Sequence, residues 1–326
     1  MIYDKNCPLV SVITPFYNTD QYLAGCIRSV LAQTYGNFEY ILVNNCSTDL
    51  SAEIARSFAR QDSRIRVIDN PALLPKVENY NHAIEQMSAS SKYMKIAQAD
   101  DSLYPGCIDE MVSLAEANPS VGLVSSYYIL GTRVSNIGLP CDKSVFNGRD
   151  ICRLQLLDGS NFYFGNYSTV MARSEIARAR RPCYTPDTYN DDTEFCYEVL
   201  GDWDFGFVHQ VLSFTREGNE SLSQSISTFG PEYPDYFIAL NKYGPKYLSE
   251  AEFETRLSAT RYWYMRYLAQ QLFRGRDDVF WDFHKRGWHI AGQSLERRAV
   301  LRRAAIEVAL LIPHPRRLAG LLFGRD

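Results

Sequence analysis

Two adjacent carboxylates, Asp100 and Asp101, come directly after the apolar run "KYMKIAQ". Neighbouring carboxylates repel each other unless a cation neutralises them. A hard divalent ion, Mg²⁺ or Mn²⁺, can be held by one or two carboxylates and completed by substrate phosphate oxygens. The alternative is that this Asp-Asp-Ser sequence caps a helix that begins near Tyr104. Because a cap does not exclude a ligand, the pair predicts a metal site for a phosphorylated substrate.

A polar segment also follows each of two other predicted strands. Thr14 to Asn18 end the first strand, and Asn44 to Asp49 follow the apolar run "YILV". In open parallel sheets, ligands bind beyond the carboxyl ends of the strands, where these segments and the carboxylate pair would meet. Asn44 and Asn45 also fit a hydrogen-bonded turn. The convergence of three polar clusters nevertheless predicts one binding site.

The elements that must bring these clusters together alternate between strand and helix. Short apolar runs predict strands at 9–14, 38–43, 65–70 and 92–98. Apolar residues at helical spacing predict the intervening helices at 20–34, 49–60 and 76–87. This alternation is typical of an α/β protein with a largely parallel sheet covered by helices.

The rest of the chain is less regular. Its pattern predicts strands at 121–130, 165–173 and 204–218, with a helix at 191–201. From about residue 232 the pattern becomes helical and aromatic, and "YWYMRYLAQQLF" (262–273) is the clearest helix.

Composition excludes several classes of protein. A net charge of -4 argues against general binding to nucleic acid. Eight cysteines without any CxxC spacing argue against a zinc ribbon and favour a reducing, cytoplasmic compartment. The first residues lack the features of a signal peptide, and no run reaches the roughly 18 apolar residues of a membrane-spanning helix.

The long segment "SVITPFYNTDQYLAGCIRSVLAQTYGNFEYILVNNCSTD" resembles the opening of the family-2 glycosyltransferases, which have the GT-A (Rossmann-like) fold. "KIAQADDSLYPGCIDEM" resembles the metal-site motif of that family. The resemblance implies a GT-A-like catalytic domain at 1–230 and a helical C-terminal extension at 231–326. Within the catalytic domain it implies a nucleotide-binding half at about 8–125 and an acceptor half at about 126–230.

The resemblance also implies roles for individual residues. Asp100 and Asp101 match the metal-site carboxylates, of which one contacts the ribose and the next, Asp101, holds the metal that bridges the diphosphate. Asn44 stands where the family has an aspartate that reads the base, and Asp49 closes that motif. The loop that would line the nucleotide pocket consists of Thr14, Pro15, Phe16, Tyr17 and Asn18.

The chain departs from the family pattern in both motifs. Asn44, Asn45 and Cys46 replace two aspartates and a glycine, and Gln98 replaces an acid. An asparagine both donates and accepts hydrogen bonds, so Asn44 can still pair with a base edge. Its lack of charge, however, argues against assigning a uridine donor by default. Metal binding remains the prediction because the carboxylate pair is retained.

Sugar transfer also needs a group that takes the proton of the acceptor hydroxyl as it attacks. The segment "NDDTEFCYEV" (190–199) resembles the acidic pair that precedes a helix in the family, which implies Asp192 as the base and Asp191 as its neighbour. The alternative is that both only complement the N-terminal end of that helix. Members of the family invert the anomeric centre, so direct displacement is implied.

Two basic residues are candidates for contacts with the donor phosphates. "TREGNESLS" (215–223) resembles the loop that closes over the diphosphate, and Arg216 within it can pair with phosphate. Lys76 begins the helix predicted at 76–87, where a lone lysine is usually just solvated. We assign both to donor binding.

The last segment, 294–326, combines arginines with apolar residues. From Lys285 to Asp326 there are nine Lys and Arg against three Asp and Glu. An anionic membrane surface would attract such a segment, so peripheral contact at the cytoplasmic face of the inner membrane is expected. The alternative is packing on the catalytic domain or on another subunit of a homo-oligomer.

The combined prediction is a metal-dependent, inverting glycosyltransferase that uses Mn²⁺ or Mg²⁺ and a nucleotide-sugar donor. The acceptor implied is a glycan or lipid-linked molecule of bacterial surface polysaccharide or glycolipid synthesis. Gln98, Asn44 and Asn45 keep open a catalytically inactive nucleotide-sugar-binding relative. A nucleotidyltransferase is a lesser alternative, because "TPFYNTD" lacks the glycine-rich phosphate loop usual in that class.

Overall fold

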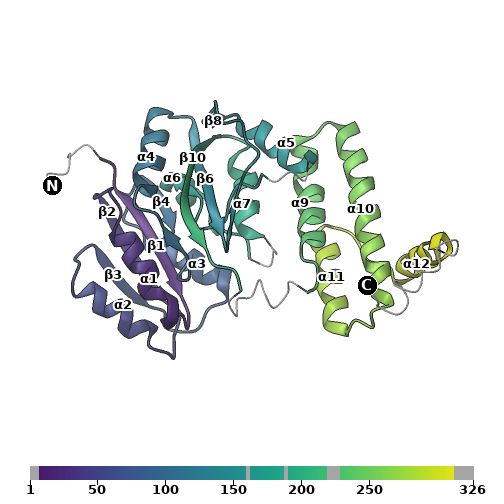
Figure 1. Ribbon diagram of the computed structural model, residues 1–326, viewed down its shortest axis with the longest axis horizontal. Helices are drawn as coiled ribbons and strands as arrows, with labels where there is room; N and C mark the ends of the chain where they lie inside the picture. Colours follow the sequence, from purple (N-terminus) through teal and green to yellow (C-terminus); the bar gives the residue numbers. More distant parts are fainter. Residues whose placement is uncertain (1–6, 159–161, 187–189, 219–227, 312–326) are drawn as a thin grey trace. The chain divides into compact units, whose positions relative to one another are not determined.

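The computed structural model describes residues 7–158, 162–186, 190–218 and 228–311. The chain divides into two compact units, residues 1–219 and 220–326 (Figure 1). All of the predicted site residues lie in the first unit. Most of the segment "TREGNESLS" and residues 312–326 of the predicted membrane segment lie outside the described residues.

The first unit is built on one mixed sheet whose main path runs β3-β2-β1-β4-β9-β6-β10-β5 (Figure 1). Strands β1 to β4 are parallel, as are β6 and β10, and β9 is antiparallel to its neighbours β4 and β6. The strands of this path are β1 (Val10–Phe16), β2 (Phe38–Asn44), β3 (Ile65–Asp69), β4 (Tyr93–Ile96), β5 (Ser102–Leu103), β6 (Val121–Leu130), β9 (Met171–Arg173) and β10 (Asp204–Thr215). Two short strands pair beside it, β7 (Arg133–Ser135) with β6 and β8 (Val145–Phe146) with β10.

The helices of this unit pack their apolar faces on the sheet. α1 (Asp20–Leu31) shows the pattern, because Leu23, Ile27 and Val30 recur every three or four residues and are fully buried. Burying one such side chain stabilises the fold by about 1.5–3 kcal/mol. The others are α2 (Ser51–Ala59), α3 (Lys76–Glu85), α4 (Cys107–Ala117), α5 (Gly148–Asp158), α6 (Ser174–Ala179) and α7 (Asp191–Val199).

The predicted fold class, a largely parallel α/β sheet with flanking helices, is confirmed. The clearest departure is the strand expected at 165–173, of which only β9 is formed. Residues before it make a turn, because the Asn166 side chain accepts hydrogen bonds from the Thr169 backbone N–H (3.1 Å) and hydroxyl (2.8 Å). Gly165 precedes the turn with φ +116°, a conformation that favours glycine.

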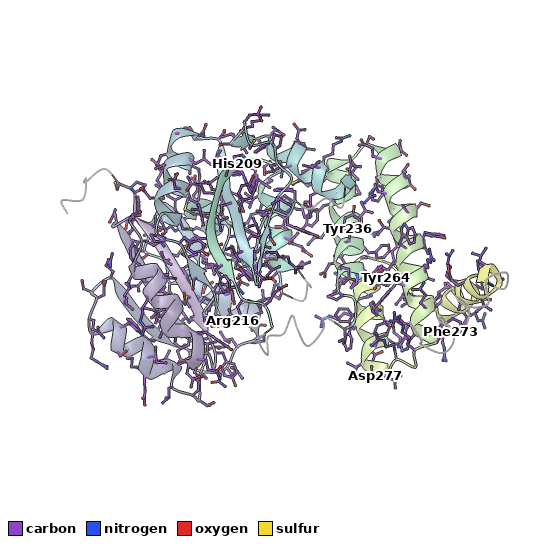
Figure 2. The ribbon with its side chains drawn as sticks, viewed as in Figure 1. His209, Arg216, Tyr236, Tyr264, Phe273 and Asp277 are labelled. Atoms are coloured by element: carbon purple, nitrogen blue, oxygen red, sulfur yellow. The ribbon has the colours of Figure 1, made fainter. Side chains whose placement is uncertain are left out.

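The second unit is helical. Its helices are α9 (Glu232–Tyr247), α10 (Glu250–Leu272), α11 (Asp278–Ile290) and α12 (Arg297–Leu311). Their core is mainly aromatic: Phe237, Tyr264 (Figure 2), Phe280 and Trp288 are all buried. His284 belongs to this core, and burial lowers its pKa to about 4. Across the described residues, no helix has both the length and the apolar character needed to span a bilayer.

Candidate active site

The polar segments after β1 and β2 are tied to each other by hydrogen bonds. The Asn18 side chain accepts from the Thr48 backbone N–H at 2.8 Å. The Asp49 carboxylate accepts from the backbone N–H groups of Asp20 and Ser51, both at 3.0 Å, where α1 and α2 begin. Burial alone would raise the pKa of Asp49, but these hydrogen bonds outweigh it and lower the pKa. The two loops therefore form one preorganised edge.

Only part of the predicted nucleotide-lining loop offers side chains to solvent. Thr14 is fully buried, and its hydroxyl donates to the Ala97 carbonyl at 2.7 Å. Pro15 and Phe16 are buried as well, whereas Tyr17 is 45% exposed and Asn18 is exposed. Thr14 to Phe16 thus hold the loop in place, and Tyr17 and Asn18 are available to a ligand.

Asn44 uses its amide inside the protein. Its Nδ2 donates to Asp69 Oδ1 at 2.8 Å, and its Oδ1 accepts from the Ser47 backbone N–H at 2.9 Å. The hydrogen bond from Asn44 lowers the pKa of Asp69, and Arg56 adds to this against the opposing effect of burial. Asp69, the last residue of β3, therefore adds a second carboxylate to this edge besides Asp49, at a residue that we did not predict. The signal was the next-to-last position of the strand predicted at 65–70.

The Asn45 side chain hydrogen-bonds to the segment that leads into α3. Its side chain accepts from the Leu74 backbone N–H and donates to the Leu74 carbonyl, both at 2.9 Å. The same Asn45 oxygen accepts from Asn70 at 2.8 Å. Since α3 begins two residues after Leu74, Asn45 helps to place Lys76. Its structural partners explain why an amide stands at a position that is 4% exposed.

Asp101 is the deeper member of the first carboxylate pair, at 2% exposure, and Asp100 beside it is half-buried. Asp101 accepts from the Thr215 hydroxyl and the Arg216 backbone N–H, both at 3.3 Å. Burial raises the pKa of Asp101 to about 7; a hydrogen bond with Ser168 opposes this rise and the charge of Asp100 adds to it. The antiparallel pairing of β5 with β10 brings Asp101 against this strand end.

Arg216 directly follows the last residue of β10 (Figure 2). Its guanidinium lies over the ring of Tyr22 at 4.2 Å from the centroid. Tyr22 belongs to the first turn of α1, so Arg216 connects that helix with the strand end beside Asp101. The structure therefore brings Asp100, Asp101 and Arg216 into one neighbourhood.

The second carboxylate pair opens α7. Asp191 is 5% exposed and accepts a hydrogen bond from the Tyr167 hydroxyl. Asp192 is half-buried, and its Oδ1 accepts from the Thr193 backbone N–H at 2.7 Å. Burial raises the pKa of both carboxyls, the charge of Asp192 raises that of Asp191 further, and Lys76 opposes both shifts.

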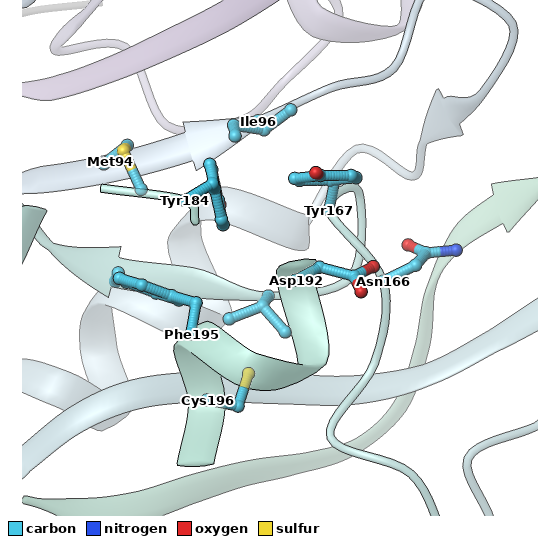
Figure 3. A pocket seen from close by; sticks show the side chains of 10 residues that line it. Met94, Ile96, Asn166, Tyr167, Tyr184, Asp192, Phe195 and Cys196 are labelled. Carbon is cyan, nitrogen blue, oxygen red and sulfur yellow. The ribbon is translucent and has the colours of Figure 1, made fainter. Parts of the chain in front are cut away.

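A small cavity lies beside Asp192 (Figure 3). Its volume of about 10 Å³ is close to the space needed for one water molecule. Asn166, Tyr167 and Asp192 line its polar side, and apolar side chains, among them Ile96 and Phe195, line the remainder. Asp192 is thus partly enclosed by apolar side chains, and burial is the main cause of its raised pKa.

Lys76 lies beside this second pair. Its Nζ is 5.2 Å from the ring centroid of Tyr167 and 5.8 Å from that of Tyr80. The two tyrosine rings pack with centroids 4.4 Å apart. The sequence predicts Lys76 as a contact for the donor phosphates, and the structure places it beside the acid pair of α7. The pattern contains no signal for Tyr80 and Tyr167, whose rings lie near its ammonium.

The carboxylates suit a divalent cation held jointly with a phosphorylated ligand. Within the described ranges, no three His, Cys, Asp or Glu side chains form a self-contained metal cage. A Mg²⁺ or Mn²⁺ ion completed by phosphate oxygens needs only one or two carboxylates. Asp101 fits such a site, because its raised pKa shows that burial disfavours the lone anion and a cation would relieve this.

Comparison with known sequences links this arrangement to one family. Residues 11–156 match the model described as glycosyl transferase family 2. An uncharacterized glycosyltransferase of Haemophilus influenzae is 31% identical over 232 residues, which are 67% of this chain and 69% of that protein. The putative teichuronic acid biosynthesis glycosyltransferase TuaG of Bacillus subtilis is 28% identical over 175 residues, 54% of this chain and 66% of that protein.

Solved structures show the same fold at low sequence identity. S. aureus TarS 1-349, in complex with UDP-GlcNAc, superposes with a TM-score of 0.63 at 13% identity, covering 94% of this chain and 91% of that chain. The mannosyltransferase PcManGT from Pyrobaculum calidifontis, in complex with GDP-Man and Mn²⁺, gives a TM-score of 0.56 at 15% identity, covering 98% and 86%.

Proposed function

Because the chain belongs to glycosyl transferase family 2 and has the GT-A fold, we propose that it transfers a sugar from a nucleotide-sugar donor to an acceptor hydroxyl, with inversion. The observation that carries this proposal is the arrangement of two carboxylate pairs in one unit. The charges of Asp100, Asp101 and Asp191 all act on the Tyr80 hydroxyl, although Asp191 lies about ninety positions after the other two.

The donor would bind at the edge formed by the loops after β1, β2 and β3, within residues 8–125. Tyr17 is the exposed aromatic side chain of this edge and can stack on a base. Asn18 and Asp49 hold the edge rigid, and the Asn44–Asp69 pair offers a carboxylate to base N–H groups. Two structural neighbours bind UDP-GlcNAc and GDP-Man, which supports a nucleotide sugar without selecting its base.

The diphosphate would lie near Asp101, with Asp100, Arg216 and Lys76 around it. Asp101 and Asp100 would hold Mn²⁺ or Mg²⁺, which supplies charge neutralisation for the departing diphosphate when bound. The complex of one structural neighbour with GDP-Man and Mn²⁺ supports a divalent cation. Arg216 and Lys76 contribute positive charge to the phosphate oxygens.

The acceptor would bind within residues 126–230. Asp192 takes the proton of the acceptor hydroxyl on Oδ2, since its Oδ1 already accepts a hydrogen bond from the Thr193 backbone N–H. The hydroxyl oxygen then attacks the anomeric carbon from the face opposite the diphosphate, whose bond to that carbon breaks, so the configuration inverts. The similarity to a putative teichuronic acid biosynthesis glycosyltransferase supports a role in polysaccharide synthesis. We propose a glycan or lipid-linked acceptor of bacterial surface polysaccharide or glycolipid synthesis, with transfer at the cytoplasmic side of the membrane.

A catalytically inactive nucleotide-sugar-binding relative is the second candidate. The observation in its favour is Asn44, whose amide is already committed to Asp69 and Ser47. Both candidates bind a nucleotide sugar, and only the enzyme turns it over.

A donor screen separates these candidates. Purified protein is incubated with the common nucleotide sugars, with Mn²⁺, Mg²⁺ or EDTA, and products are followed by mass spectrometry. We expect one donor to release its nucleoside diphosphate only when a divalent ion is present, together with Mn²⁺-dependent binding in calorimetry. Metal-dependent binding without turnover would select the inactive relative. Absence of any nucleotide binding would contradict both.

Membrane contact by α12 forms a separate part of the proposal. The outward face of this helix carries Arg298 and Arg302, together with the half-exposed apolar side chains of Leu301, Ile306 and Leu310. Its acid, Glu307, is turned inward and pairs with Arg266 at 3.2 Å and with Arg303. A helix surface with cations and apolar groups but no acid suits an anionic bilayer.

Vesicle flotation tests this contact. We expect the protein to bind vesicles with anionic lipid, to release them at high salt, and to lose at least about tenfold in binding when Arg298 and Arg302 are both changed to Glu. Arg28→Glu with Arg60→Glu, two exposed arginines of the first unit, is the charge-matched control. No vesicle binding, combined with dimerisation that the α12 substitutions abolish, would assign this face to a second copy instead.

A further inference from the structure

One turn, residues 166–169, contributes to both carboxylate pairs. On the Asp101 side, Asn166 Nδ2 donates to the Thr215 hydroxyl at 2.9 Å, and that hydroxyl donates to Asp101 at 3.3 Å. Ser168 also hydrogen-bonds to Asp101. On the other side of the turn, the Tyr167 hydroxyl donates to Asp191. The turn therefore joins two groups of acids that are about ninety positions apart in the sequence.

The side chain of Lys95 hydrogen-bonds to the backbone at this turn. This residue lies in β4 and is fully buried, the sole lysine in that condition along the described ranges. Its Nζ donates to the Ser168 carbonyl, and to the Val170 carbonyl at 3.3 Å. An ammonium group is expensive to bury unless it is hydrogen-bonded, so its presence in a strand needs a reason.

An apolar residue would pack well at this point of β4 but could not bind the turn. It would leave the Ser168 and Val170 carbonyls without the donor that Lys95 supplies. The residue before the turn is also closely packed: a Cβ at Gly165 would come within 2.8 Å of the Ser125 hydroxyl and 2.9 Å of Thr169 Cβ. The ammonium therefore sets where the backbone of the turn lies above the sheet.

We propose that Lys95 is a positioning residue, which fixes the 166–169 turn so that Asp101 and the Asp191–Asp192 pair are held at the spacing that sugar transfer requires. This inference rests on the proposed function. Lys95 touches neither donor nor acceptor in this scheme and acts only through the turn. Displacements of about 1 Å in a catalytic group can reduce a rate by roughly 10²-fold, so a lost support should be visible in kcat.

Lys95→Met is the test, because methionine fills a similar volume without the charge. We expect kcat to fall by roughly 10²-fold, and Mn²⁺ binding, titrated with UDP and with GDP by electron paramagnetic resonance, to weaken at least tenfold. The pH profile of kcat/KM should also move, since Tyr167 shifts relative to Asp191. Lys92→Met is the matched control: Lys92 lies just before β4, and its exposed ammonium pairs with Glu116 at 2.7 Å.

A double-mutant cycle keeps the test informative if Lys95→Met is poorly stable. Ser168→Ala and Tyr167→Phe are made alone and together, since both side chains leave from the supported turn. If the turn acts as one body, the effects of the two substitutions should not be additive, either on Mn²⁺ binding or on the pH profile. Independent effects would overturn the shared support.

The outcomes separate this inference from the proposed function. Unchanged kcat and Mn²⁺ binding in Lys95→Met, or a lower melting temperature alone, would refute the role of Lys95 in an active enzyme. If the unmodified protein turns over no donor, the proposed function fails. The Mn²⁺ titration then still decides whether Lys95 supports Asp101.

Discussion

Asp101→Asn is expected to reduce sugar transfer by roughly 10³-fold, or about 4 kcal/mol of transition-state stabilisation. The substitution keeps the volume of the side chain and an oxygen that can accept from the Arg216 backbone N–H. It removes the charge that would hold the divalent ion beside the diphosphate. Initial rates with the donor identified by screening, at saturating Mn²⁺, measure the effect.

The stability of Asp101→Asn supplies the control. Burial disfavours the ionised form of Asp101, as its raised pKa shows, so loss of the charge should not lower the free energy of unfolding at neutral pH. A variant that is inactive and at least as stable as the unmodified protein indicates a role in the reaction. Full activity in this variant would remove Asp101 from the mechanism.

Asp192→Asn is expected to reduce kcat by roughly 10²–10⁴-fold, the range typical of general acid–base catalysis. The asparagine can still accept from the Thr193 backbone N–H, so the start of α7 should be preserved. Donor binding should be nearly unchanged, since Asp192 would act on the acceptor hydroxyl. Calorimetric donor affinity and steady-state kcat, measured together, separate binding from chemistry.

The pH dependence of the same reaction gives a second measurement on Asp192. Its pKa is raised, chiefly by burial, so this carboxyl stays protonated at pH values where an ordinary aspartate, with a pKa of about 3.9, is ionised. A protonated carboxyl cannot take the acceptor proton. The rate of sugar transfer should therefore fall as the pH is lowered, with a midpoint above about pH 4. The residual activity of Asp192→Asn should lack this acid limb of the pH–rate profile. An unchanged limb would assign it to another group.

The same shifts predict the sign of the linkage with folding. A carboxyl whose folded pKa lies above its unfolded value binds its proton more tightly in the folded protein. Asp191 and Asp192 therefore contribute stability at low pH that is lost as the pH rises through their folded pKa values. The fold is therefore most stable when Asp191 and Asp192 are protonated, and a protonated carboxyl cannot accept the proton of the acceptor. Such a conflict between stability and activity is common at active sites.

The nucleotide-binding half of the fold was predictable because its elements obey local rules. Each of β1 to β4 is a short segment with apolar residues, and α1 has a clear apolar stripe, so their order and type follow from the sequence pattern. The meeting of polar segments at strand ends follows from parallel topology. The position of Asp100 and Asp101 at this edge of the sheet follows from that topology.

The remaining part of the site depends on contacts that a local pattern does not contain. The partner of Asn44 is Asp69 because the register of β2 and β3 sets these two residues opposite each other. Lys76 comes close to Tyr167 although the two residues are about ninety positions apart. The sequence pattern predicts a strand where the structure has the turn at 166–169, because residue type alone does not reveal the competing hydrogen bonds of the Asn166 side chain.

The pairing of Asn44 with Asp69 also limits how this chain can evolve. Asn44→Asp would set two anions at the 2.8 Å now spanned by a hydrogen bond. This substitution is therefore unfavourable unless Asp69 is replaced first. The two positions are coupled, so an acid at residue 44 requires an ordered pair of mutations.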